Sequence, residues 1–230
     1  MTKLSIIVPV YNERNTVAEL LRRAASVDID KEIIVVDDGS TDGTSEILDR
    51  WEHEPLTVIR HPKNLGKGAA IRSGLVRAAG EYVIVQDADL EYDPSQIPRL
   101  MIPLEQGECD AVYGNRFPLY DKRDIRGVQI LAFVANQLLA WLMSALFMRR
   151  IRDIETCYKV MRTDIARSLG LRSDRFDIEP EITAKLLKGG YRIKEVPIRY
   201  CYRPYSEGKK ITWRDGIAAF IVVIKYRFVD

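Results

Sequence analysis

The sequence predicts an α/β protein with a mostly parallel central sheet and helices on both faces. Short apolar runs in the first half are typical of strands buried on both faces. Segments with apolar residues at helical spacing lie between these runs, so that strand and helix alternate four times. Polar clusters follow the predicted strands, and ligands of such sheets bind beyond the carboxyl ends of the strands.

The first half contains four predicted strands with helices between them. The first strand, LSIIVPV, is an apolar run, and the helix after it has apolar residues three and four positions apart. The second strand ends in DDGSTDGT, which is a turn and helix-cap pattern. The predicted strands are 4–10, 32–37, 56–60 and 82–86, and the predicted helices are 17–25, 45–51 and 67–79.

An uncharged segment of 22 residues, 127–148, lies in the second half. Its length would allow it to cross a bilayer, but Gln129, Asn136, Gln137 and Ser144 oppose simple immersion in lipid. Arginines flank both ends, which suits a helix or helix pair in the membrane interface. An apolar helix packed on the sheet and a membrane span are the two alternatives.

Two further apolar segments follow. Residues 192–200 alternate as a strand, and Pro197 favours an edge position because proline cannot donate a ladder hydrogen bond. Residues 217–224 are apolar but too short to span a membrane.

Charge and cysteine content restrict the class of protein. The net charge of +2 combines −8 over residues 1–115 with +10 over residues 116–230. The basic half suits phosphates or anionic lipid headgroups, whereas the acidic half would repel a nucleic-acid backbone, so we expect no nucleic-acid partner. Three dispersed cysteines and an N-terminus without a signal-peptide pattern predict a reducing, cytoplasmic location.

The strand at 82–86 is followed directly by three acidic residues at alternate positions, Asp87, Asp89 and Glu91. In an extended backbone such positions point to one side, so the three carboxylates could hold a cation. Mg²⁺ and Mn²⁺ take oxygen ligands and are commonly held by one or two carboxylates together with substrate phosphates. The alternative is an acidic turn without a ligand.

Other candidate residues each have a functional and a structural interpretation. Gly66 and Gly68 flank Lys67 at a helix start, which suits either a bound diphosphate or a solvated helix end. Glu179 and Glu181 suit either an acceptor site or a helix start. We expect His53 and His61 at the surface and Cys157 in a packing role.

Motifs along nearly the whole chain resemble a known family. IVPVYNE at 7–13, VDDGSTDGT at 36–44, NLGKG at 64–68 and DAD at 87–89 resemble the family 2 inverting glycosyltransferases with a GT-A fold. Later motifs resemble the polyprenyl-phosphate hexosyltransferase branch, which includes the dolichol-phosphate mannose synthases: GNRF at 114–117, DxxTCYK at 153–159, FDIE at 176–179, EVP at 195–197 and RxYxExK at 203–209.

The resemblance implies roles for particular residues. Positions around the base and ribose of a nucleotide sugar are matched by Pro9, Tyr11, Glu13, Val36 and Asp38. Asp87 and Asp89 match the pair that binds metal and diphosphate. Basic positions that grip donor or acceptor phosphates are matched by Arg116, Arg203 and Lys209, and more loosely by Arg126.

The sequence departs from the mannose synthases at two places. Glu91 stands where these enzymes often carry glutamine, so an oxygen ligand is kept but a charge is added. Residues 207–213, EGKKITW, replace the usual ESKLGG ending, which leaves the choice between mannose and glucose open.

The implied function is inverting transfer of a hexose from a nucleotide sugar to a polyprenyl or dolichyl phosphate at the cytosolic face of a membrane. Mannose from GDP-mannose is expected first, glucose from UDP-glucose second, with Mg²⁺ or Mn²⁺ as cofactor. Residues 1–115 would bind the nucleotide sugar and residues 116–230 the acceptor, within one continuous catalytic domain. The interfacial helix or an anchoring partner subunit would hold the chain at the membrane.

The chemistry of the acceptor separates this function from its alternatives. A phosphomonoester has a second pKa of about 6, so a lipid phosphate is already ionised and needs positioning rather than a base. Transfer to a hydroxyl of a polysaccharide or soluble glycan requires a carboxylate base instead. A non-catalytic nucleotide-binding module is the alternative from another class.

Overall fold

The computed structural model describes residues 3–119, 128–202 and 213–229. A seven-stranded sheet in the order β3-β2-β1-β4-β6-β5-β7 runs through both halves of the chain. The strands are β1 (Leu4–Val10), β2 (Lys31–Asp37), β3 (Leu56–Arg60), β4 (Tyr82–Val85), β5 (Ala111–Asn115), β6 (Lys159–Arg162) and β7 (Ile193–Pro197).

The pairing is parallel within the first half and mixed beyond it. β1 pairs in parallel with β2 over all seven residues and also with β4, and β2 pairs in parallel with β3. β6 is antiparallel to both β4 and β5, whereas β5 and β7 are parallel. The predicted parallel α/β arrangement is confirmed, and β7 with Pro197 lies at the sheet edge as predicted.

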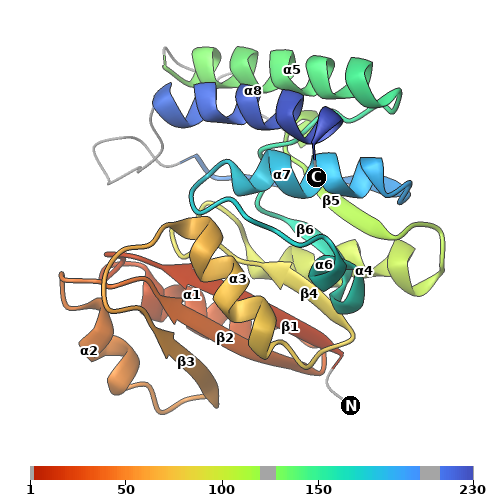
Figure 1. Ribbon diagram of the computed structural model, residues 1–230. Helices are drawn as coiled ribbons and strands as arrows, with labels where there is room; N and C mark the ends of the chain where they lie inside the picture. The colour runs from red at the N-terminus through yellow and green to blue at the C-terminus, as the bar shows by residue number, and fades with distance from the viewer. Residues whose placement is uncertain (1–2, 120–127, 203–212, 230) are drawn as a thin grey trace.

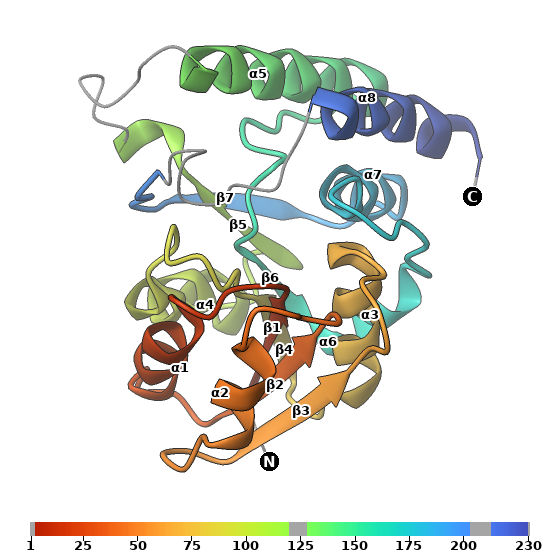
Figure 2. The same cartoon turned by 90° about the vertical axis from the view of Figure 1, so that its left-hand side faces the viewer.

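Helices cover both faces of the sheet. α3 and α6 lie on one face and α1 and α4 on the other, with α2 beside α1 (Figure 2). Their bounds are α1 (Val17–Ala25), α2 (Thr44–Asp49), α3 (Lys67–Arg77), α4 (Ile97–Glu105) and α6 (Thr163–Ser168), with 3₁₀ turns at Pro94–Gln96 and Phe117–Leu119. The main core forms between these layers, with Leu4, Ile6, Ile34 and Ile84 fully buried.

Three helices form a separate layer at one end of the molecule (Figure 1): α5 (Val128–Phe147), α7 (Ile178–Lys188) and α8 (Trp213–Phe228). α5 contacts α7 and α8 rather than the sheet, which corrects the alternative of a helix packed on the sheet. Leu139, Met143, Val223 and Tyr226 are buried in a second core between the three helices. Within the described residues, no helix is long and apolar enough to cross a membrane.

The outer side of this layer remains apolar. Val134, Leu138 and Trp141 of α5 are exposed at spacings of four and three residues. α8 repeats the pattern with a second exposed stripe, Ile217, Ile221, Ile224 and Phe228. Each helix therefore has one side in the second core and one apolar side facing outward.

Candidate functional site

The ends of three parallel strands bring the candidate nucleotide and metal residues to one edge of the sheet. Tyr11 and Glu13 follow β1, and Asp38 follows β2. Asp87 and Asp89 follow β4, which pairs with β1 on its other side. The polar clusters thus lie at the carboxyl ends of the strands as expected, and ligand binding there stays a prediction.

Hydrogen bonds join the loops after β1 and β2. Asn12 has a φ of 52°, in the left-handed region, and its backbone N–H donates to Ser40 Oγ at 3.0 Å. Thr41 donates its N–H to Asn12 Oδ1 at 2.8 Å, and Glu13 donates its N–H to Thr44 Oγ1 at 3.0 Å. These hydrogen bonds join the two loops into one hydrogen-bonded unit at this edge of the sheet.

Asp38 organises the loop before α3. Its carboxylate accepts the backbone N–H groups of Leu65 and Gly66 at 2.9 and 2.8 Å. His61 Nδ1 lies 2.6 Å from Asp38 Oδ1, and His61 Nε2 lies 2.9 Å from Ser73 Oγ. The prediction of a surface His61 is wrong, because its side chain is only 8% exposed and is held by these two partners.

Two of the residues expected around the base and ribose lie within the strands themselves. Pro9 is in β1 and Val36 in β2, where they are register partners. Val36 is fully buried between β1 and β3. The ligand contacts of these residues, and of Tyr11, Glu13 and Asp38, stay predictions.

The acidic segment after β4 is a turn and not an extended strand. β4 ends at Val85, and Leu90 has a φ of 64°, in the left-handed region that residues with a Cβ seldom adopt. Asp89 Oδ1 accepts the backbone N–H of Glu91 at 3.0 Å. The carboxylates of residues 87–91 come together through this turn, so the expectation of an extended backbone with alternating sides is wrong.

The turn concentrates negative charge. The pKa of Asp89 is raised to about 7, chiefly by burial and also by the neighbouring Asp87 and Glu91 carboxylates, against smaller lowering effects of the Glu91 N–H and Lys67. A bound cation would remove this repulsion, so the turn fits a divalent metal. Among the described residues, no three acidic, histidine or cysteine side chains are arranged to hold an ion alone. Diphosphate oxygens or water would have to complete the shell, as is usual for Mg²⁺.

Two of the candidate ligands already have partners within the chain. Lys67 Nζ lies 2.8 Å from Asp87 Oδ1. The Tyr200 hydroxyl donates to Glu91 Oε2. Tyr200 and Tyr92 also form an isolated antiparallel β-bridge. Asp89 is therefore the carboxylate of the turn most available to a metal, and the metal roles of Asp87 and Glu91 stay predictions.

A row of buried ion pairs continues from the turn into the protein. Lys67 Nζ is 3.1 Å from Glu179 Oε1, and Lys159 Nζ pairs with Glu179 Oε2. Lys67 is thus committed to Asp87 and Glu179, and its contact with a diphosphate remains a prediction. The two lysines hold the pKa of Glu179 below its ordinary value against the opposing effect of burial, which is the largest single influence.

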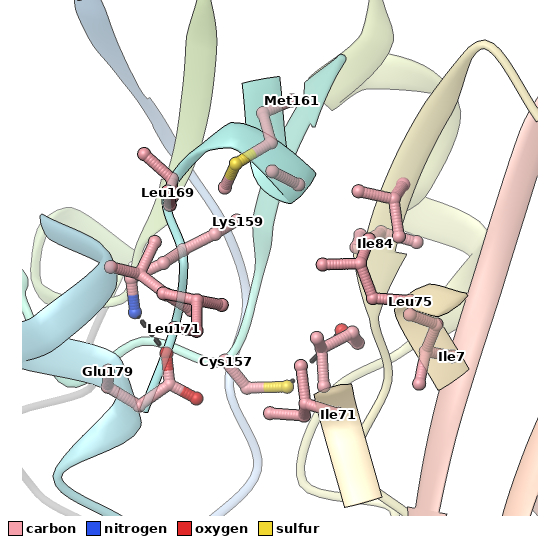
Figure 3. Close-up of a pocket in the computed structure, with 14 residues that line it drawn as sticks. Ile7, Ile71, Leu75, Ile84, Cys157, Lys159, Met161, Leu169, Leu171 and Glu179 are labelled. Carbon is pink, nitrogen blue, oxygen red and sulfur yellow. Dashed lines mark hydrogen bonds and ion pairs between the residues drawn. The ribbon is translucent and has the colours of Figure 1, made fainter. Parts of the chain in front are cut away.

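An apolar wall lies behind the Lys159–Glu179 pair (Figure 3). A cavity of about 30 Å³ is lined by the pair, by Cys157 and by aliphatic residues such as Ile71 and Leu169. Cys157 Sγ donates to the Val85 carbonyl at 3.2 Å, and burial raises the pKa of this thiol well above its ordinary value. The cavity has no room for a sugar, and the packing role expected of Cys157 fits these contacts.

The glycines at the start of α3 accommodate the protein's own backbone. A Cβ on Gly66 would lie 2.3 Å from the Asp174 carbonyl oxygen, and one on Gly68 would lie 2.2 Å from that of Ser173. The Ala69 N–H donates to the Asp174 carbonyl at 3.2 Å. The glycines permit a close approach as expected, and the group that approaches in the structure is the 173–174 loop; a contact with a diphosphate stays a prediction.

Glu181 holds the same loop from the other side. It is fully buried, accepts the N–H groups of Arg172 and Ser173 at 2.9 and 2.7 Å, and pairs with Lys185 at 2.8 Å. Of the two interpretations of Glu181, the structural one accounts for all of these contacts.

Arg116 follows β5 and forms the basic side of the site. Its Nε and Nη2 atoms donate to the two carboxylate oxygens of Asp153 at 2.8 and 2.7 Å. The guanidinium carbon lies 5.1 Å from the centre of the Tyr200 ring, and Tyr200 in turn contacts Glu91. Asp153 accepts from two of the five guanidinium N–H groups, and the binding of a phosphate by Arg116 stays a prediction.

The remaining basic candidates, Arg126, Arg203 and Lys209, lie outside the described residues. Sequence reasoning also missed two residues of the site. Both belong to the DxxTCYK motif, in which Lys159 is a motif letter and Glu155 a variable position. Lys159 is paired with Glu179 of α7 and Glu155 is bonded to Asn136 of α5, and no local pattern shows either contact.

Comparisons with known proteins identify the fold and the family. The family model described as glycosyl transferase family 2 matches residues 5–170. The chain belongs to glycosyltransferase family 2. A crystal structure of glucosyl-3-phosphoglycerate synthase from Mycobacterium tuberculosis, which contains Mn²⁺ and UDP, superimposes over the whole chain and 80% of that protein with a TM-score of 0.74 and 21% identity. The glycosyltransferase therefore has the expected GT-A-like fold.

Two curated relatives act on lipid phosphates. A dolichol-phosphate mannosyltransferase from Pyrococcus furiosus is 31% identical over 90% of this chain and 59% of its own length. A dodecaprenyl-phosphate galacturonate synthase from Rhizobium johnstonii is 28% identical over 90% of this chain and 61% of its own length. The glycosyltransferase spans about three fifths of each relative.

Proposed function

We propose that this family 2 glycosyltransferase transfers a hexose from a nucleotide sugar to a polyprenyl phosphate with inversion and with Mg²⁺ or Mn²⁺. The observation that carries the proposal is the contact of Arg116, through Tyr200, with the acidic turn at Glu91. One side of the site thus suits a metal-bound diphosphate and the other suits a second phosphate. Both relatives named above act on lipid phosphates, and the Mycobacterium tuberculosis enzyme binds Mn²⁺ with UDP.

Different residues are proposed to act on the leaving diphosphate and on the acceptor phosphate. A metal on Asp89 would neutralise the charge that develops on the leaving diphosphate. Lys67 fixes the orientation of Asp87 by their ion pair. Arg116, oriented by Asp153, would place the acceptor phosphate for attack on the anomeric carbon, and the ionised phosphate needs no base. Arg203 and Lys209 are proposed to bind phosphate with it. Mannose is favoured over glucose only by the resemblance.

The assay that tests this proposal follows the sugar into lipid. The full chain is incubated with Mn²⁺ or Mg²⁺, radiolabelled nucleotide sugars and polyprenyl phosphate in vesicles, beside a set of hydroxyl acceptors. Label should enter the organic phase, and Asp89→Asn should abolish this while Asp28→Asn, at an exposed site, does not. Label found only in water-soluble glycans would overturn the lipid acceptor.

We propose further that the exposed stripes of α5 and α8 lie on the membrane surface that carries the acceptor. Trp141 and Phe228 are 71% and 74% exposed, and the exposed cations Arg149, Arg150 and Lys225 flank the stripes. Trp141→Asp combined with Ile221→Asp should reduce flotation with anionic vesicles. Val76→Asp, on α3, is the matched control, because Val76 is 77% exposed outside this layer. Equal flotation of all three proteins would remove the membrane role of these helices.

A further inference from the structure

Lys159 fixes the backbone on both sides of Glu155. Its ammonium group donates to the carbonyl oxygens of Ile154, at 2.8 Å, and Thr156, and pairs with Glu179 of α7. The Glu155 N–H donates to Asn136 Oδ1 of α5 at 3.2 Å. With both neighbouring carbonyls and its own amide held, Glu155 has a fixed position in the site.

Buried oxygens without a hydrogen-bond partner gather around this lysine. Within the part of the chain that the structure describes, they are Glu155 Oε1, Thr156 Oγ1 and Glu179 Oε1. Buried polar atoms are nearly always hydrogen-bonded in folded proteins, so each exception calls for a ligand or an ordered water. Glu179 Oε1 still has its ion pair with Lys67, whereas Glu155 Oε1 has no hydrogen-bond partner among the described residues.

Glu155 lies in the chain between residues of two buried ion pairs. Asp153, two positions before it, pairs with Arg116, and Lys159, which holds the carbonyls of Ile154 and Thr156, pairs with Glu179. Glu179 connects through Lys67 to Asp87 of the acidic turn. In a transfer between two phosphates, the sugar occupies the space between the leaving diphosphate and the attacking phosphate. Glu155 is held between the ion pair of Arg116 and the ion pairs that lead to the acidic turn.

Burial is the main reason why the pKa of Glu155 rises to about 7, with the nearby Glu179 and Asp153 raising it and Lys159 and Arg116 lowering it. A neighbouring hydrogen-bond donor would stabilise the ionised form. A second carboxylate would be repelled by both Glu155 and Glu179, because like charges at such a site disfavour each other.

We infer that Glu155 recognises the transferred sugar, accepting a hydrogen bond from one of its hydroxyl groups and thereby selecting neutral hexoses over uronic acids. This inference rests on the proposed function, since it takes the sugar to lie between the acidic turn and Arg116. It distinguishes the chain from its relative that transfers galacturonate. Thr156 Oγ1 adds a second unpartnered oxygen beside Glu155.

The test separates sugar contacts from nucleotide contacts by direct binding. Calorimetry with Mn²⁺ compares UDP-glucose, UDP-glucuronate and UDP, and a second set compares GDP-mannose, GDP-mannuronate and GDP. Glu155→Ala should weaken binding of the nucleotide hexose about tenfold and leave the nucleoside diphosphate unchanged, since only the sugar contact is lost. Glu155→Gln should narrow the preference for hexose over uronate. Glu52→Gln, at an exposed position, is the control.

The outcomes separate this inference from the proposed function. Equal weakening of nucleotide hexose and nucleoside diphosphate would assign Glu155 a structural role and overturn the inference. An unchanged hexose-to-uronate ratio in Glu155→Gln would also overturn it. A wild-type chain that discriminates between these sugars through Glu155, yet transfers none to polyprenyl phosphate, would refute the acceptor and leave the sugar contact standing.

Discussion

The unpartnered carboxylate of Glu155 should reduce stability at neutral and alkaline pH. Its pKa is raised from an ordinary 4.5 to about 7, so the folded protein binds this proton more tightly than the unfolded chain does. The stabilising contribution is complete below pH 4.5 and is lost as the pH rises through 7. A difference of about 2.5 pKa units corresponds to about 3 kcal/mol at most, as an order of magnitude.

Glu155→Gln removes the titration while keeping the shape of the side chain. At pH 8 the variant should unfold with a free energy up to about 3 kcal/mol above that of the wild type, and the difference should shrink toward pH 5. Urea denaturation followed by far-ultraviolet circular dichroism at pH 5, 6, 7 and 8 measures this, with Glu52→Gln as the exposed control. A difference that does not change with pH, or that grows on acidification, would refute the reasoning.

Three further substitutions test the contacts around the site. Lys159→Met should lower the free energy of unfolding by about 3–5 kcal/mol, because buried Glu179 loses a counter-ion; a urea midpoint equal to wild type would contradict the buried pair. Gly68→Ala should destabilise the chain by about 1–3 kcal/mol, since its Cβ would meet the Ser173 carbonyl; Gly216→Ala, with open space around it, is the thermal-melting control. Arg116→Lys should reduce sugar transfer at least about tenfold, because one ammonium cannot replace the bidentate pair; full activity would show that charge alone suffices.

The first half of the fold could be predicted because its signals are local. Every strand of residues 4–85 is an apolar run, and the polar turns mark where each one ends, so the observed bounds of β1 to β4 differ from those predicted by one residue at most. The second half could not be derived in the same way. β6 is only four residues long and owes its place between β4 and β5 to antiparallel pairing across the chain. Nothing in the sequence KVMR alone indicates that partner.

The candidate site shows the same division between local and distant information. Asp38 follows β2 directly and Asp89 lies in the turn after β4, so a local pattern indicates their position. His61, Glu155 and Lys159 acquire their surroundings from residues far along the chain. His61 depends on Asp38, 23 positions away, and Lys159 depends on Glu179, 20 positions away. Burial and partners of that kind arise only when the helices pack on the sheet.

Glu91 connects the acidic turn to the segment after β7 through both its backbone and its side chain. Its carbonyl accepts the N–H of Cys201 at 2.9 Å, and its carboxylate accepts the hydroxyl of Tyr200, so it ties the acidic turn to the segment after β7. The same carboxylate contributes to the raised pKa of Asp89. A glutamine at this position would keep an oxygen for Tyr200 but remove that charge. The difference from the mannose synthases therefore keeps the geometry of the turn and adds a negative charge. A bound cation would stabilise this turn more than it would stabilise one with glutamine.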